Sequence, residues 1–372
     1  MALFNVEMNK YTVNTQVFCI NPEHPDIDII KLAARVLQNQ GLVAFPTETV
    51  YGLGANALDE TAVGRIFEVK QRPFADPLIV HIAEKAQIEF VATSIPSIAY
   101  QLVEKFWPGP LTLVLRRHER VAKNVSAGLG TVAVRMPNHC IPLTLIKTAG
   151  VPVAAPSANL FSRPSPTNAQ HVLDDLGGCV DIILDGGPCT IGLESTVLDL
   201  TVENPKILRP GGAPAEVLKE IIPNLVLPNF SSVDGEPSSK PSPGMLDKHY
   251  SPKAKFLLFE GGKAGTVSHI REVANQIIAQ GKSVGLMVTD EEYSQFADLP
   301  IEIERLGTQD DLSMIGQNLF AKMRSLDKKG VDYILMRSLP SEGLGLAISD
   351  RLFKAAEQHV IDLDNDVDYQ KD

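Results

Sequence analysis

The segment 45–81 constrains the fold of this chain more than any other part of the sequence. It starts at the end of an apolar run, 42–45, which has the composition of a buried strand, and a second such run spans 78–82. Between them, the apolar residues of 60–70 fall on one face of a helix, and Asp59 stands where an aspartate caps a helix. We therefore expect a strand, a helix and a strand in succession, which is the unit that builds α/β folds.

Short apolar runs and amphipathic stretches alternate along the rest of the chain. Up to about residue 226 some expected strands follow each other directly, as around 111–136, which indicates a mixed sheet. After residue 252 strands and helices alternate regularly, which predicts a parallel sheet with Rossmann-like winding. The expected helices are 26–40, 60–70 and 98–106 in the first block, and 267–280, 311–326 and 346–358 in the second.

The stretch 228–252 is rich in proline, serine and glycine, a composition typical of a linker or an ordered loop. A chain of 372 residues is also long enough for two domains. We predict an α/β protein with a larger domain over 1–227, a linker over 228–252 and a smaller C-terminal domain over 253–372.

Charge and cysteine content exclude several classes of protein. The net charge of −11 argues against a broad nucleic-acid-binding surface, so any anion site must be a local cluster of Lys and Arg. The four cysteines are scattered and form no C-x-x-C pair, which indicates neither a zinc site nor a disulfide framework. No apolar run reaches membrane-spanning length. We expect a cytoplasmic protein with no membrane partner.

Four cations stand out as candidates for an anion site. Lys70 and Arg72 end the expected helix next to a proline; they are either solvated cations that complement the helix dipole or ligands of an anion at a strand end. Arg135 lies in an apolar strand and needs an acidic partner or an anionic ligand. Arg209 precedes a glycine pair. If these cations converge, they form a pocket for a polyanion and a carboxylate.

Polar side chains lie at the ends of the expected strands, where open α/β sheets collect ligands. Thr49 comes after the first strand, just before a glycine pair, Gly52 and Gly54, whose flexible backbone can approach a ligand closely. Other polar residues of this kind are Ser157, Asn159, Ser165, Ser195 and Thr196.

Several of these segments resemble the YrdC-like family in its longer, two-domain form, the L-threonylcarbamoyladenylate synthases. The shared motifs are PTETVYGLG, K-x-R-P followed by PLIVH, WPGPLT, TVAVRMP, APSAN, ESTV with RPG, and HYSP at the end of the linker. The resemblance implies an open, twisted mixed sheet with a positively charged cavity, followed by a Rossmann-like domain.

The resemblance also implies a nucleotidyltransferase that condenses L-threonine, bicarbonate and ATP into threonylcarbamoyl-AMP, with release of pyrophosphate. The product serves threonylcarbamoyl modification of the adenosine 3′ of the tRNA anticodon, through downstream threonylcarbamoyl-transferase proteins, so tRNA is an indirect partner. Mg²⁺ is expected to enter with ATP and to be held mainly by phosphates, with no dedicated protein ligands.

The resemblance assigns roles to individual residues. Arg135 is expected to bind the threonine carboxylate; the rest of the threonine site would be Thr49, His81, Ser195 and the backbone of Ala155. The expected nucleotide contacts are Lys70, Arg72, Asp76, Thr131, Ser157, Asn159, Ser165, Arg209 and Tyr250, with Lys70 and Arg72 also expected to be catalytic. The linker segment 243–252 is expected to act as a lid that docks on the first domain through Tyr250, or else as a passive tether.

Two other functions remain open for this fold. One is RNA binding without catalysis, which the acidic total charge disfavours. The other is a carbamoyl-transferring maturation enzyme, a class that carries zinc-finger cysteines and an acylphosphatase-like segment, neither of which this chain has.

Overall fold

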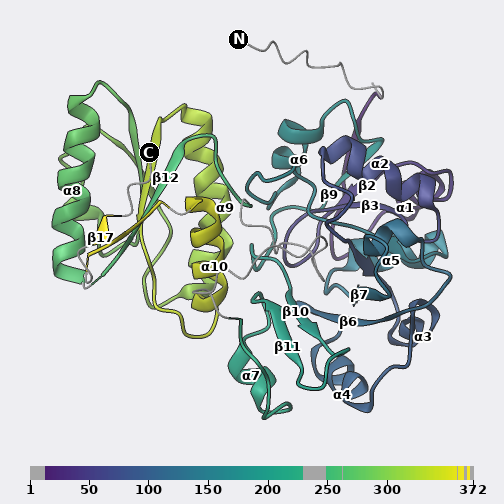
Figure 1. Cartoon of the computed structure of the whole chain (residues 1–372). Helices are drawn as coiled ribbons and strands as arrows, with labels where there is room; N and C mark the ends of the chain where they lie inside the picture. The colour runs from purple at the N-terminus through teal and green to yellow at the C-terminus, as the bar shows by residue number, and fades with distance from the viewer. Residues whose placement is uncertain (1–12, 229–248, 262, 358, 364–366, 369–372) are drawn as a thin grey trace, which may run out of the picture.

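The computed structural model describes residues 13–228, 249–261, 263–357, 359–363 and 367–368, and these form two sheets flanked by helices (Figure 1). The strands of one sheet all come from 16–209 and the strands of the other from 255–368. We call residues 13–228 the N-terminal unit and the described residues from 253 onward the C-terminal unit. Most of the stretch between them, 229–248, lies outside the described residues.

The sheet of the N-terminal unit is mixed, as expected. Its strand order is β1-β9-β2-β3-β8-β4-β7-β6-β10-β11, with β5 paired to β6. The strands are β1 (Gln16–Cys19), β2 (Val43–Phe45), β3 (Gly52–Asn56), β4 (Ile79–His81), β5 (Ala92–Thr93), β6 (Leu111–Arg117), β7 (Thr131–Arg135), β8 (Val153–Ala154), β9 (Ile182–Asp185), β10 (Thr196–Asp199) and β11 (Lys206–Arg209). The helices are α1 (Ile27–Gln38), α2 (Glu60–Lys70), α3 (Ile88–Val91), α4 (Ser97–Phe106), α5 (Cys140–Ala149), α6 (Ala169–Leu176) and α7 (Ala215–Lys219), with short 3₁₀ turns at Lys85–Gln87 and Lys123–Ser126.

Helix α2 spans the range expected from the sequence, and its ends show why. The Asp59 carboxylate accepts hydrogen bonds from the amides of Thr61 and Ala62, at 2.8 and 3.2 Å. At the other end Gln71 adopts a left-handed conformation with a φ of 55°. This turn stops the helix directly before Arg72 and redirects the chain toward the sheet.

The glycine pair that follows β2 is part of a strand. Gly52 and Gly54 lie in β3, which pairs antiparallel with β2. A Cβ atom at Gly54 would lie 2.6 Å from Cε1 of Phe45 and 2.8 Å from Cγ1 of Val153. The absent side chain therefore makes room for the Phe45 ring, which the sequence pattern alone did not indicate.

The sheet of the C-terminal unit has the order β14-β13-β15-β12-β16-β17 and is parallel except for β17, which confirms the expected winding. Its strands are β12 (Lys255–Glu260), β13 (Val284–Val288), β14 (Glu302–Arg305), β15 (Tyr333–Arg337), β16 (Val360–Asp362) and β17 (Val367–Asp368). Its helices are α8 (Lys263–Ala279), α9 (Leu312–Lys329) and α10 (Gly345–Ala356), with a 3₁₀ turn at Tyr293–Gln295.

Helices α9 and α10 lie between the second sheet and the N-terminal unit, whereas α8 lies on the opposite face (Figure 1). The contact is close because Gly192 has no side chain: a Cβ there would lie 2.5 Å from the Cα of Gln317 in α9. Leu193 of the N-terminal unit packs within the core of the C-terminal unit. No helix of the described chain is both long and apolar enough to cross a membrane.

Candidate functional site

A cavity opens where the polar ends of several strands of the N-terminal unit meet the end of the linker. The residues that line it are Thr47, Thr49, Val50, Gly52, Arg72, Ile79, His81, Arg135, Ala155, Pro156, Ser157, Glu194, Ser195, Arg209, His249 and Tyr250. The structure thus brings together most of the residues singled out in the sequence. Three cations, Arg72, Arg135 and Arg209, reach this one cavity.

Arg135 is held at the wall of the cavity by partners on both sides. Strands β4 and β7 pair in register, so that Arg135 lies opposite His81. Its Nη1 donates to Thr49 Oγ1 at 2.8 Å, and its Nη2 forms an ion pair with Glu48 Oε1 at 2.7 Å. The acidic partner that an arginine in an apolar strand requires is therefore Glu48, which sequence reasoning missed. Its only signal was its place between two threonines in PTETV.

His81 faces the cavity as a neutral ring. It is buried, and burial together with the nearby Arg135 charge lowers its pKa to about 3. At neutral pH the imidazole carries no charge and does not repel the guanidinium opposite it. It therefore offers a hydrogen-bonding ring nitrogen to a ligand, with no added positive charge.

Lys70 and Arg72 are buried, which rules out the interpretation that they are solvated cations at a helix end. Arg72 lines the cavity and pairs with Asp76 at 2.8 Å, and it also donates to the backbone oxygens of Asp76 and Pro77. Burial, and then the charge of Arg72, lower the pKa of Lys70. Burial raises the pKa of Asp76, and Arg72 opposes this rise. Asp76 therefore holds Arg72 in place from behind the cavity wall.

Lys70 lies behind the loop that carries the S-x-N motif. Its ammonium group donates to the backbone oxygen of Ser157 at 2.5 Å and also to that of Asn159. The side-chain nitrogen of Asn159 donates to the backbone oxygens of Leu160 and Arg163, at 2.6 and 3.0 Å. Of these residues Ser157 lines the cavity, so Lys70 and Asn159 shape the loop from within.

Glu194 is a further residue that sequence reasoning missed. Its Oε1 accepts a hydrogen bond from Ser165 Oγ at 2.5 Å, and its Oε2 pairs with Nε of Arg351 at 2.8 Å. Burial alone would raise the pKa of Glu194, but Arg351 and Arg209 lower it. Arg351 belongs to α10 and is fully buried, so the C-terminal unit contributes a charge to the wall of the site. The motif ESTV contained the glutamate, but nothing local indicated its distant partner.

Arg209, the last residue of β11, meets Ser195, which directly precedes β10. The Arg209 guanidinium donates to the Ser195 backbone oxygen at 2.9 Å and lies 3.3 Å from its hydroxyl. That hydroxyl is also 2.7 Å from Thr112 Oγ1. The polar atoms of Ser195 are thus arranged by neighbouring strands.

The end of the linker closes one side of the cavity. His249 and Tyr250 are buried there, and neither His249 Nδ1 nor the Tyr250 hydroxyl has a hydrogen-bond partner within the part of the chain that the structure describes. Tyr250 stacks on Phe320 of α9 at 5.4 Å and lies beneath Arg351 at 5.2 Å. Its ring packs in the core of the C-terminal unit and also lines the cavity of the N-terminal unit. Ser251, which follows it, donates its amide to the backbone oxygen of Ser162 at 2.7 Å. The expectation that Tyr250 docks on the first domain stays a prediction. The remainder of the expected lid, 243–248, lies outside the described residues.

Thr131 lies apart from the other expected contacts. It begins β7, whereas Arg135 ends it, and four residues of strand span about 13 Å. Thr131 is not among the residues that line the cavity. The structure gives no support to its expected contact with a nucleotide.

Comparison with known proteins gives two matching families. The family described as "Telomere recombination" (Sua5, YciO and YrdC) matches residues 35–211, and the one described as "Threonylcarbamoyl-AMP synthase, C-terminal domain" matches 214–357. The chain is 46% identical to the threonylcarbamoyl-AMP synthase of Pyrococcus abyssi over 89% of its own length and 95% of that protein. It is 43% identical to the enzyme of that name from Bacillus subtilis, over 89% of its own length and 94% of that protein.

Among solved structures, the crystal structure of P. abyssi Sua5 complexed with L-threonine superposes with a TM-score of 0.87 at 43% identity. The match covers 93% of this chain and 99% of that one. A match of this extent includes both units, so the arrangement of the two sheets is that of a known architecture.

Proposed function

Because this chain belongs to the Sua5/YrdC family of threonylcarbamoyl-AMP synthases, we propose that the cavity described above is the place where it makes threonylcarbamoyl-AMP from L-threonine, bicarbonate and ATP. The observation that carries this proposal is the convergence of Arg72, Arg135 and Arg209 on one cavity of an acidic protein. Such a cluster suits the anionic groups of the substrates, which include an amino acid carboxylate and a triphosphate.

We assign L-threonine to the side of the cavity that holds Arg135. The P. abyssi relative binds L-threonine. In this chain Arg135, Thr49 and His81 form a group of a cation, a hydroxyl and a neutral imidazole, close to the backbone of Ala155 and to Ser195. A carboxylate would be recognised by the guanidinium, and the amine and hydroxyl of threonine by the neutral groups.

We assign the phosphates of ATP to the side that holds Arg72, Ser157 and Arg209. Lys70, Asn159 and Ser165 lie just behind this side and set the course of the loop 155–167. The role of Asp76 in this scheme is to hold Arg72, and that of Tyr250 is to cover the nucleotide from the linker.

The chemistry requires positioning more than acid–base catalysis. The amine of threonine, after loss of a proton, forms a C–N bond with the carbon of bicarbonate, which loses its hydroxyl as water, and the resulting carbamate is already an oxygen nucleophile. One carbamate oxygen attacks the α-phosphorus of ATP, the bond from that phosphorus to the bridging oxygen breaks, and pyrophosphate leaves with the electron pair. The arginines hold the two anions against each other and spread the charge that develops on the phosphoryl oxygens.

Mg²⁺ would enter with ATP and would be bound mainly by phosphate oxygens. Within the described residues no group of three or more His, Cys, Asp or Glu is placed so that it could hold a metal ion. The two carboxylates nearest the phosphate side, Asp76 and Glu194, are each already paired with an arginine. These residues fit a metal that the nucleotide carries better than one held by the protein.

The product would pass to downstream threonylcarbamoyl-transferase proteins that modify tRNA, and the protein would act in the cytoplasm. RNA binding without catalysis is the less favoured function, because the relatives that match both units are named as synthases.

The test is the dependence of pyrophosphate release on each substrate. We expect release from ATP only when both L-threonine and bicarbonate are present, and a product with the mass of threonylcarbamoyl-AMP. L-serine should be a poor substrate, since the fit of a pocket to one methyl group is worth ~1–3 kcal/mol. Equal release without threonine would overturn the proposal, and RNA binding that excess ATP does not displace would support the alternative.

A further inference from the structure

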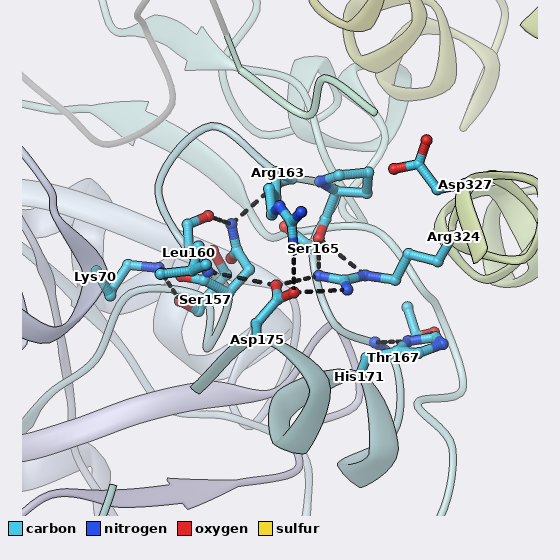
Figure 2. A network of polar contacts seen from close by, with 12 residues as sticks. Lys70, Ser157, Leu160, Arg163, Ser165, Thr167, His171, Asp175, Arg324 and Asp327 are labelled. Atoms are coloured by element: carbon cyan, nitrogen blue, oxygen red, sulfur yellow. Dashed lines mark hydrogen bonds and ion pairs between the residues drawn. The ribbon is translucent and has the colours of Figure 1, made fainter. Parts of the chain in front are cut away.

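The loop 155–167 is held from outside the cavity by one buried carboxylate. The side chain of Asp175, in α6, is 1% exposed. It accepts a hydrogen bond from the backbone amide of Leu160 at 3.3 Å and pairs with the guanidinium of Arg163 at 3.0 Å (Figure 2). Both partners belong to the loop that presents Ser157 to the cavity.

The third partner of Asp175 comes from the C-terminal unit. Arg324 of α9 reaches across the interface, and its Nη2 lies 2.6 Å from Asp175 Oδ2 while its Nη1 lies 3.2 Å from Oδ1 (Figure 2). The same guanidinium donates to the backbone oxygen of Pro164, at 2.5 Å from Nη2 and 3.1 Å from Nε. Arg324 therefore binds the loop twice, once through Asp175 and once directly, next to Ser165.

The loop that Arg324 and Asp175 hold is also bound by Lys70 through hydrogen bonds. Lys70 donates to the backbone oxygens of Ser157 and Asn159, and its own backbone oxygen accepts from the amide of Phe161 at 2.9 Å. Burial dominates the lowered pKa of Lys70, but Asp175 raises that pKa and Arg324 lowers it. The two charges of the interface therefore lie close enough to affect the ammonium group.

We propose that Arg324 and Asp175 are positioning residues for the nucleotide half of the site, through which the C-terminal unit fixes the loop 155–167 in the shape that binds ATP. Neither residue lines the cavity. The inference rests on the proposed function and gives the C-terminal unit a part in it: ATP binding depends on the contact between α9 and the loop. Threonine binding does not, because Ala155, the residue of the loop on the threonine side, is held by β4 through its amide, which donates to the backbone oxygen of Ile79 at 2.9 Å.

The obvious competing explanation is that Arg324 only joins the two units. The chain offers a matched control for this, because Gln317 of the same helix also crosses the interface. Its side-chain nitrogen donates to the backbone oxygen of Cys189 at 3.1 Å, outside the loop. Arg271 provides a second control, since it makes a two-bond ion pair with Asp298 within the C-terminal unit and touches no residue of the loop.

The variants are expected to fold. Arg324 borders a groove that is also lined by Arg163, His171, Lys253 and Lys328. Shortening its side chain widens this groove and leaves the cores of both units intact. Asp175→Asn keeps the shape of the side chain and removes its charge, and Arg324→Lys keeps the charge but has one donor group where arginine has a fork.

The experiment measures KM for ATP and for L-threonine separately, by pyrophosphate release from the full chain, together with ATP binding by calorimetry without the other substrates. We expect Arg324→Ala to raise KM for ATP and to weaken ATP binding by about 10-fold or more, since small displacements of a site carry costs of this order. KM for threonine should change less than about twofold, and Arg324→Lys should be intermediate. Gln317→Ala and Arg271→Ala should leave both constants unchanged.

A double variant tests the path through Asp175. If Arg324 positions the loop through this carboxylate, Arg324→Ala should raise KM for ATP by a smaller factor in the Asp175→Asn variant than in the unsubstituted chain. An unchanged KM for ATP in folded Arg324→Ala, an equal rise in Gln317→Ala, or equal rises for both substrates would overturn the inference. Should Arg324→Ala not fold, Arg324→Lys and Asp175→Asn decide by the same comparison. Failure of the unsubstituted chain to release pyrophosphate would instead refute the proposed function.

Discussion

Replacement of Arg135 by alanine separates two roles that this side chain combines. In the structure it neutralises Glu48, at 2.7 Å, and it lines the cavity where we place the threonine carboxylate. At an effective dielectric constant of about 20, two charges ~2.7 Å apart attract by about 6 kcal/mol before desolvation is counted. Removal of one partner from a buried pair costs about 3–5 kcal/mol, because the other charge is left unpaired.

We therefore expect Arg135→Ala to lower the free energy of unfolding by about 3–5 kcal/mol. Threonine binding should weaken by about 2–5 kcal/mol, the usual result of truncating one side of a buried charge pair. Nucleotide binding should change much less, since Arg72 and Arg209 remain in place. Thermal unfolding and calorimetry with L-threonine and ATP measure the three quantities.

The decisive variant combines Arg135→Ala with Glu48→Gln. Glutamine removes the orphaned charge, so most of the lost stability should return, but a carboxylate ligand still has no cation to bind. We expect threonine affinity to stay low in the double variant and to be kept in Glu48→Gln alone. If the double variant bound threonine as tightly as the unsubstituted chain, Arg135 would serve only to neutralise Glu48, and the threonine site would have to be assigned elsewhere.

Three further predictions test other parts of the structure. The pKa of His81 is lowered to about 3, below the ~6.5 of an exposed histidine, so between these two pH values the unfolded chain binds more protons than the folded chain and acidification lowers stability. His81→Asn should therefore make the melting temperature less dependent on pH in this range. An unchanged slope of melting temperature against pH would contradict this. Gly54→Ala should lower the free energy of unfolding by ~1–3 kcal/mol, because the new Cβ overpacks against Phe45. Gly64→Ala, in a helix where the new Cβ has no neighbouring atom within 4 Å, should instead raise it by ~0.5–1 kcal/mol. Chemical unfolding of the two variants measures both changes. Tyr250→Phe removes a buried hydroxyl that has no hydrogen-bond partner among the described atoms, so the melting temperature should stay unchanged while product formation slows. Full activity of this variant would show that the hydroxyl takes no part in the site.

Much of the local structure followed from short-range patterns. Asp59 predicted the start of α2, and the two cations next to Pro73 marked its end, since capping and proline effects act within a few residues. The position of Arg135 in an apolar strand predicted that it needs a partner, and the structure supplies one. The glycines of β3 show the limit of such reasoning: the sequence suggested a backbone that can approach a ligand closely, and Gly52 does line the cavity, but only the structure shows that the Phe45 ring packs against both glycines.

The sequence by itself determined the two α/β units, the family, and the set of polar residues at the strand ends, because each depends on neighbours in the chain or on contiguous motifs. Tertiary structure alone decided how charges are paired. Arg135 and Glu48 are 87 positions apart (135 − 48), Arg324 and Asp175 are 149 apart, and Arg351 and Glu194 are 157 apart. Each arginine is buried or nearly so, and a buried charge requires a partner. Which carboxylate meets that need depends on the packing of the sheet and of the C-terminal unit, and no local pattern of residues records it.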